Sequence, residues 1–114
     1  MNLNSNDIAQ GKYEQAKQNA LIGYNIFLKR PESLSDNVKV KVLTGLYNAY
    51  HYQAQYDSAL YYLYKQEPYI KDGTVAKGGF YDRIGLIYTN VGKYDKAIAY
   101  HQKSIDILEK MHSP

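Results

Sequence analysis

The chain has 114 residues, of which 45% are hydrophobic and 22% are charged, and its formal net charge is +3. This length fits a single domain, and the composition is too apolar for a disordered chain. The absence of cysteine excludes disulfides, thiolate zinc sites and cysteine nucleophiles. No apolar run is long enough to span a bilayer, and the polar residues 1–10 are not typical of a signal peptide.

The basic and aromatic residues limit the classes of partner. Scattered lysines supply most of the positive charge, and only Arg30 and Arg83 are able to make bidentate contacts to phosphates or bases. We therefore do not expect direct nucleic-acid binding. The 14 tyrosines, with no tryptophan, predict helices packed through large residues whose hydroxyls reach water or a partner.

One four-residue pattern occurs three times and combines an aromatic residue, an acid, a variable residue and an alanine. The copies begin at Tyr13, Tyr56 and Tyr94. An acid in the first turn of a helix interacts favourably with the positive end of the helix dipole, so each copy predicts a helix start. Gly11 and Gly92 precede the first and third copies, where a tight turn between helices needs a residue that accepts positive φ. Ala54 takes this place before the second copy.

This pattern divides the chain into six predicted helices that form three hairpins. Their ranges are 2–10, 12–29, 36–53, 56–70, 75–91 and 94–112. Between the hairpins, Pro31 and Ser35 supply a stop and an N-cap, and Asp72-Gly73-Thr74 supplies a turn and a second N-cap.

The last hairpin carries the most specific pattern. One predicted helix face holds Tyr81, Ile84, Gly85 and Tyr88. A glycine inside a helix suggests a close approach, and we expect Gly85 to meet Ala97 on the partner helix. This face, followed by Gly92, Tyr94 and Ala97, resembles the signature of the tetratricopeptide repeat (TPR) family.

The two earlier repeats match this signature less well. Repeat two has in register Leu43, Leu46, Tyr50, Tyr56 and Ala59, but Tyr47 stands where the family has a small residue. Repeat one keeps Leu3, Gly11, Tyr13 and Ala16, but Asn4 and Asp7 replace the small residue and the tyrosine. The pattern recurs after 43 residues (13 to 56) and 38 residues (56 to 94). The family repeat is about 34 residues long, so longer helices or joins are expected.

The resemblance implies an all-α fold, a right-handed stack of antiparallel helix hairpins. It implies one domain, 1–114, with repeats at about 1–33, 34–72 and 73–114, and the truncated first repeat leads us to expect that a longer protein contains it. In the final helix we expect an inward face made by Ala97, Ile98, Ile105 and Leu108. A second stripe of Tyr100, Ile107 and Met111 then has nothing to cover it, which predicts further repeats or a homo-oligomer.

Candidates for catalysis or metal binding are few. His51, His101 and His112 form no motif with the carboxylates, and the last two lie about 16 Å apart along one predicted helix. We expect no enzymatic activity, no cofactor and no metal site.

Two other groups are interpreted structurally. The tyrosines at 61, 62 and 64 cover two helix faces, which favours packing over a stacking platform for bases. Gly78-Gly79 lacks a phosphate-binding pattern and is interpreted as a flexible helix entry.

In the TPR family the first helix of each pair lines a ligand groove. Carried over to this chain, the groove residues are Lys41, Thr44, Asn48, His51 and Tyr52 from repeat two and Asp82, Arg83, Leu86, Thr89 and Asn90 from repeat three. Some members clamp a terminal carboxylate with lysine, asparagine and arginine, and Asn48 and Arg83 match two such places. The clamp's lysines are missing, with Gly79 at one of their positions, so the resemblance does not extend to chaperone-tail binding.

These observations predict a non-catalytic scaffold module that binds a protein or peptide in this groove. The alternative is a sensory or regulatory domain of a bacterial signalling protein or transcriptional regulator, which a neighbouring kinase, membrane span or helix-turn-helix would select. We expect a cytoplasmic location, or a periplasmic one if a signal or membrane segment was removed.

Overall fold

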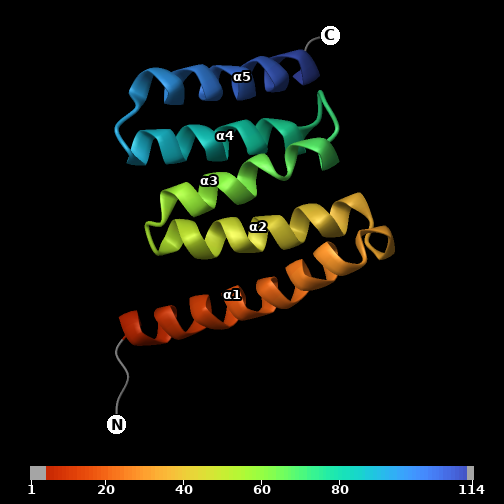
Figure 1. Cartoon of the computed structure of the whole chain (residues 1–114). Coiled ribbons are helices and arrows are strands. Elements are labelled where there is room, and N and C mark those ends of the chain that lie inside the picture. Colours follow the sequence, from red (N-terminus) through yellow and green to blue (C-terminus); the bar gives the residue numbers. More distant parts are fainter. Residues whose placement is uncertain (1–4, 113–114) are drawn as a thin grey trace.

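The computed structural model describes residues 5–112, with side chains from residue 11 onward. It contains, in chain order, α1 (Ser5–Lys29), η1 (Pro31–Ser33), α2 (Asp36–Tyr52), α3 (Tyr56–Tyr64), η2 (Glu67–Tyr69), α4 (Val75–Asn90) and α5 (Tyr94–His112). The predicted all-α class is confirmed, since no strand occurs between residues 5 and 112. The α-helices follow one another across the molecule in chain order, with α1 and α5 at opposite ends (Figure 1).

The N-caps expected between the hairpins are present. The Ser35 hydroxyl accepts a hydrogen bond from the Val38 amide at 3.3 Å and so begins α2. The Thr74 hydroxyl accepts one from the Lys77 amide at 3.2 Å and so begins α4. Each cap satisfies a backbone donor that the first helical turn leaves unpaired.

The turns after α2 and α4 share one geometry. Ala54 and Gly92 both lie in the left-handed region, with φ of 57° and 81°. The residue after each, Gln55 or Lys93, donates its amide back across the turn to the carbonyl five residues earlier, at 2.9 and 2.8 Å. This is the Schellman pattern of helix ends, and it produces two helix hairpins, α2–α3 and α4–α5.

The first predicted hairpin is wrong, because α1 runs without a break through Gly11. Residues 5–10 of the predicted helix 2–10 belong to α1, and residues 1–4 lie outside the described part of the chain. A turn at Gly11 would leave a short, mostly polar helix with little apolar surface to bury. Continuing the helix keeps the backbone hydrogen bonds, at a cost of only about 1 kcal/mol for a glycine inside it. The described chain is therefore one long helix followed by two hairpins.

Another boundary differs at the end of α3. The predicted helix 56–70 stops at Tyr64, and the 3-10 helix η2 follows it. Pro68 explains the stop, because a proline ring clashes with the carbonyl four residues earlier, which here belongs to Tyr64. The other helix ends lie within one residue of the predicted ranges.

The main core lies where α2, α3 and α4 meet. Its buried residues are Tyr47, Ala59, Leu63, Ile70, Phe80, Ile84 and Ile87. Tyr47, at the position where the TPR family has a small residue, is 3% exposed and contributes its own ring to the core. Gln66 is also fully buried, and its amide donates to the Thr44 hydroxyl at 3.1 Å.

Small residues set the spacing between neighbouring helices. A Cβ added at Gly45 would lie 3.2 Å from the Ala20 Cβ, so α1 and α2 approach closely there. The close approach expected at Gly85 also exists, but the atoms nearest to an added Cβ belong to the His101 ring, at 2.8 Å, and not to Ala97. His101 lies one turn after Ala97 on the same side of α5, which explains the exchange.

Gly78 is packed rather than flexible. It is buried inside α4, and a Cβ there would lie 3.6 Å from the Ser104 hydroxyl oxygen. The interpretation of Gly78-Gly79 as a flexible entry is therefore wrong for its first residue. With Gly85, it draws α5 toward α4 along the side that carries Ala97 and Ser104, the two buried residues of α5.

This close packing rotates α5 away from the predicted orientation. Ala97 faces inward as expected, but Ile98, Ile105 and Leu108 are 66%, 46% and 38% exposed. The stripe predicted to be uncovered also differs, because Tyr100 and Ile107 are half-buried and only Met111 is exposed. The small residues of the α4–α5 contact, rather than the largest apolar ones, decide which side of α5 is buried.

Candidate binding surface on α2 and α4

The ten predicted groove residues lie on the first helices of the two hairpins, and we call them the α2–α4 face. The exposed members are Lys41, Asn48, Tyr52, Asp82, Leu86, Thr89 and Asn90. The half-buried members are Thr44, His51 and Arg83. Their availability to a ligand depends on which of them already have partners in the fold.

His51 links the two hairpins. Its Nε2 lies 3.0 Å from the side-chain nitrogen of Asn90, so α2 and α4 meet through this pair. The imidazole also stacks on Tyr47, with ring centres 5.4 Å apart. Burial lowers the pKa of His51, which favours the neutral ring, and an unprotonated Nε2 accepts the hydrogen bond that the Asn90 amide donates.

Arg83 also lies where α2 and α4 meet, near Tyr47. Its guanidinium reaches back along α4, with Nη1 3.7 Å from where a Cβ of Gly79 would stand, an ordinary contact distance. Burial raises the pKa of Tyr47, and the nearby positive charge of Arg83 opposes this shift. Among residues 11–112, no carboxylate oxygen lies within 4.0 Å of this guanidinium. Arg83 is therefore a half-buried cation whose donors face no acid in the described chain.

Other members of the face are engaged within the protein. A carboxylate oxygen of Asp82 lies 3.0 Å from Nδ1 of His101 on α5. The Thr89 hydroxyl donates a hydrogen bond to a backbone carbonyl of its own helix at 3.0 Å. Thr44 accepts the hydrogen bond from the buried Gln66. Tyr52 stacks on Tyr13 of α1, with ring centres 3.5 Å apart.

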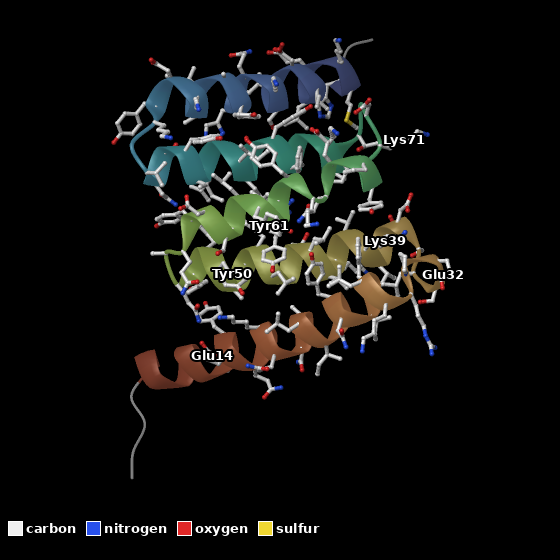
Figure 2. The ribbon with its side chains drawn as sticks, viewed as in Figure 1. Glu14, Glu32, Lys39, Tyr50, Tyr61 and Lys71 are labelled. Carbon is white, nitrogen blue, oxygen red and sulfur yellow. The ribbon has the colours of Figure 1, made fainter. Side chains whose placement is uncertain are left out.

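The first half of α1 borders this face. Glu14, labelled on α1 in Figure 2, accepts a hydrogen bond from the side-chain amide of Gln53, which follows α2, at 2.6 Å. Lys17 donates to the same Gln53 side chain at 3.5 Å. Together with the Tyr13–Tyr52 stack, these contacts fix α1 beside the end of α2. The members whose side chains have no described hydrogen bond, ion pair or ring stack are Lys41, Asn48, Arg83 and Leu86.

The tyrosines at 61, 62 and 64 divide between packing and surface. Tyr62 packs as predicted, between Tyr24 and Tyr50, at ring-centre distances of 5.4 and 5.5 Å. Tyr61 and Tyr64 are 53% and 39% exposed. Figure 2 labels Tyr61 on α3 and Tyr50 on the neighbouring α2.

Sequence reasoning missed a second surface, where α3, α4 and α5 meet. The Tyr64 hydroxyl lies 3.1 Å from that of Tyr88 and 3.2 Å from that of Tyr100. Beside these rings, α5 carries a lysine every seven residues, at 96, 103 and 110. This spacing was readable in the sequence, whereas the meeting of three tyrosines from three helices was not.

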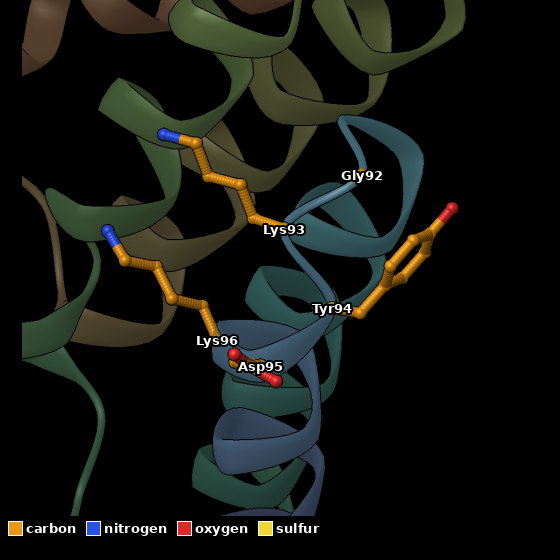
Figure 3. A pocket seen from close by; sticks show the side chains of 5 residues that line it. All are labelled: Gly92, Lys93, Tyr94, Asp95 and Lys96. Carbon is orange, nitrogen blue, oxygen red and sulfur yellow. The ribbon is translucent and has the colours of Figure 1, made fainter.

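Two hollows on the surface of residues 11–112 are open to solvent rather than enclosed. One, of about 400 Å³, lies at the α4–α5 turn, where Lys93 and Lys96 project to one side and Tyr94 to the other (Figure 3). Another, of about 470 Å³, lies between α4 and α5 and is lined by Lys77, Tyr81, Lys103 and Ile107, among others. Among the described residues, no three His, Asp or Glu side chains are placed to share a metal ion. Nor does any described helix combine the length and apolarity that a membrane span needs.

Comparisons with protein-family models, with curated proteins and with solved structures found no match for this chain.

Proposed function

We propose that this chain is a TPR-like, non-catalytic module that binds a protein or peptide on its α2–α4 face. The proposal rests on the resemblance of the last hairpin to the TPR signature and on two successive hairpins with matching turns. In such a pair the first helices carry the ligand-binding residues. The proposed ligand is an extended or helical segment of another protein.

The observation that carries the proposal is the state of Arg83. A half-buried guanidinium without a described acidic partner is a strong donor group, and its planar fork suits a carboxylate or a backbone carbonyl. Asn48 adds an exposed amide that both donates and accepts, as a peptide backbone requires. Leu86, 42% exposed on the same helix as Arg83, offers an apolar contact for a ligand side chain.

The test begins with peptides selected for binding to the wild-type protein from a random peptide library displayed on phage. Their affinities are then measured by fluorescence polarisation for the wild type and for Asn48→Ala/Arg83→Ala. We expect the double variant to bind at least about tenfold more weakly, since truncation of such anchors removes more than about 1.4 kcal/mol. Its thermal unfolding should stay close to that of the wild type.

Asn25→Ala/Arg30→Ala is the control, because it likewise removes one amide and one positive charge, at two exposed residues away from the α2–α4 face. It should retain the affinity of the wild type. Peptides that bind the wild type and Asn48→Ala/Arg83→Ala equally would place the ligand elsewhere and refute this assignment. A selection that yields no binding peptide would also count against it.

A further inference from the structure

The lysines of α5 form a regular column beside tyrosine rings of α4 and α5. Lys96, Lys103 and Lys110 are seven residues apart, and two helical turns bring such residues onto one side, about 10 Å apart along the axis. All three are exposed. Among residues 11–112, no carboxylate oxygen lies within 4.0 Å of any of their ammonium groups. The column therefore presents three charges that the described chain does not neutralise by contact.

Tyrosine rings hold these lysines in place. The Lys96 ammonium lies 5.4 Å from the ring centre of Tyr88. The Lys103 ammonium lies 5.3 Å from the ring centre of Tyr81 and 5.0 Å from that of Tyr100. Such cation–π contacts contribute about 0.5–1 kcal/mol each at exposed sites. The ammonium groups of the first two lysines of the column thus lie over tyrosine rings rather than extending freely into water.

The three tyrosine hydroxyls beside the column have one proton to spare. Tyr64 is within hydrogen-bond distance of both Tyr88 and Tyr100, and these two bonds use two of the three hydroxyl protons. Burial raises the pKa of Tyr64, and its hydrogen bonds to the other two tyrosines raise it further, so its hydroxyl stays neutral. One O–H remains to donate to an acceptor outside the protein.

The hollow between α4 and α5 continues this surface. It is lined by Lys103, Lys110 and the apolar Ile107, and also by Lys77, whose charge is already paired with Asp72 at 3.4 Å and Glu67 at 3.8 Å. Asp106 lines it too, and its carboxylate accepts a hydrogen bond from Gln102 at 2.9 Å. Two lysines without paired acids thus stand beside an apolar side chain.

Two of the acids of α5 lie on a line beside the lysine column, and a third lies next to its lysines. One residue before each lysine of the column stand Asp95, Gln102 and Glu109, which a step of 100° per residue places on a neighbouring line of the helix. Asp106, three residues after Lys103 and four before Lys110, is the acid nearest to the column. A negatively charged segment is therefore drawn to the lysines and repelled from the acids beside them.

We propose that the lysine column of α5, with the tyrosines at 64, 81, 88 and 100, is a second binding surface that takes an extended acidic peptide. A peptide in the extended polyproline II conformation advances about 3.1 Å per residue with three residues per turn, so every third side chain returns to the same side about 9 Å further along, close to the spacing of the lysines. Carboxylates at that spacing pair with the lysines, while the peptide backbone accepts the spare tyrosine proton. The surface suits a peptide better than a nucleic acid, because the ammonium groups of Lys96 and Lys103 lie over the tyrosine rings on which a base would stack. Ile107 adds an apolar contact for a peptide side chain. The surface is separate from the α2–α4 face.

The test uses a fluorescein-labelled peptide that repeats Glu-Ser-Ser, and a control peptide of the same composition whose glutamates are all adjacent. Binding is measured by fluorescence polarisation at low salt, with an oligothymidylate of equal charge as a third probe. We expect the Glu-Ser-Ser peptide to bind most tightly. Lys96→Gln/Lys103→Gln/Lys110→Gln should weaken it about tenfold, as expected for the loss of three exposed ion pairs.

A matched variant, Lys12→Gln/Lys29→Gln/Lys71→Gln, removes the same charge at three exposed lysines elsewhere and should change the affinity less than about threefold. Tyr64→Phe keeps the ring, removes the central hydroxyl and should weaken binding severalfold. Equal losses in the two triple variants would show that only net charge matters and would overturn the proposal. So would oligothymidylate binding as tightly as the peptide, which would make this a nucleic-acid surface. Asn48→Ala/Arg83→Ala should bind the acidic peptide like the wild type, which separates this test from that of the α2–α4 face.

Discussion

Ala54 and Gly92 occupy equivalent positions in two turns that have the same hydrogen-bond pattern. Only the glycine is suited to the positive φ that this position requires. Both have positive φ, 57° for Ala54 and 81° for Gly92. An L-residue with a Cβ is disfavoured there by roughly 1–2 kcal/mol relative to glycine, since its Cβ approaches the following carbonyl oxygen. The α2–α3 turn therefore carries local strain that the α4–α5 turn lacks.

Ala54→Gly should raise the free energy of unfolding by up to about 1 kcal/mol, because relief of the strain outweighs the larger entropy that glycine gives the unfolded chain. The reciprocal change Gly92→Ala should lower it by about 1–2 kcal/mol, since no neighbouring atom lies within 4 Å of the new Cβ and only the backbone is strained. Urea unfolding followed by circular dichroism measures both. Stabilisation by Gly92→Ala, or marked destabilisation by Ala54→Gly, would contradict the turn geometry.

At the scale of the elements, a glycine in this chain occurs either inside a continuous helix or in a turn with positive φ. Gly11 lies inside α1 and is not in the left-handed region, whereas Gly73, before α4, has φ of 74°. Neither would bring an added Cβ within 4 Å of another group. The two positions thus differ in backbone conformation and not in available space.

Gly11→Ala should stabilise α1, raising the helical signal and the free energy of unfolding by up to about 1 kcal/mol, because alanine is the best helix former. Gly73→Ala is the control and should lower the free energy of unfolding, since its backbone disfavours a Cβ. Far-ultraviolet circular dichroism and urea unfolding report the two effects. A loss of stability in Gly11→Ala would mean that a turn, rather than a continuous helix, occupies this position.

The helices differ in how well their sequence predicts them. α2, α4 and α5 were predicted within a residue at each end, because caps at Ser35 and Thr74 and the acid after Tyr94 act locally. The end of α3 was predicted six residues too late, at 70, although Pro68 in the sequence acts on the residue four positions before it. The orientation of α5 was not readable from its own sequence, because small residues on α4 decide which side of it is buried.

At the scale of the whole molecule, the helices that carry the candidate groove residues could be predicted. The contacts that these residues make with other side chains of the protein could not. The resemblance to the TPR family implied all ten, on the two predicted helices 36–53 and 75–91, and the structure keeps each of them exposed or half-buried. Their contacts join distant segments, as in the pair of Asp82 with His101 and the stack of Tyr52 on Tyr13. Such pairs depend on how whole helices pack, which a single sequence with unequal repeats does not specify.

The burial of His51, where the two hairpins meet, makes the stability of the protein sensitive to pH. Burial lowers the folded-state pKa of His51 below its unfolded value of about 6.5, so the unfolded chain binds the proton more readily. His51 therefore contributes full stability above about pH 6.5, and this contribution is lost as the pH falls toward the folded-state pKa. Protonation also turns Nε2 into a donor that faces the Asn90 amide nitrogen, 3.0 Å away.

We therefore expect the wild-type protein to lose more stability than His51→Gln when the pH falls from about 7.5 to about 5.5, since glutamine does not titrate. Urea midpoints at both pH values give the comparison, and the other histidines and the carboxylates contribute equally to both proteins. The difference should be small, because the ring is only partly shielded from water. Asn90→Ala should leave most of the pH dependence in place, because burial rather than the hydrogen bond is the cause of the shift. Parallel losses in the wild type and His51→Gln would show that His51 titrates as it does in the unfolded chain and that α2 and α4 meet more loosely than this contact implies.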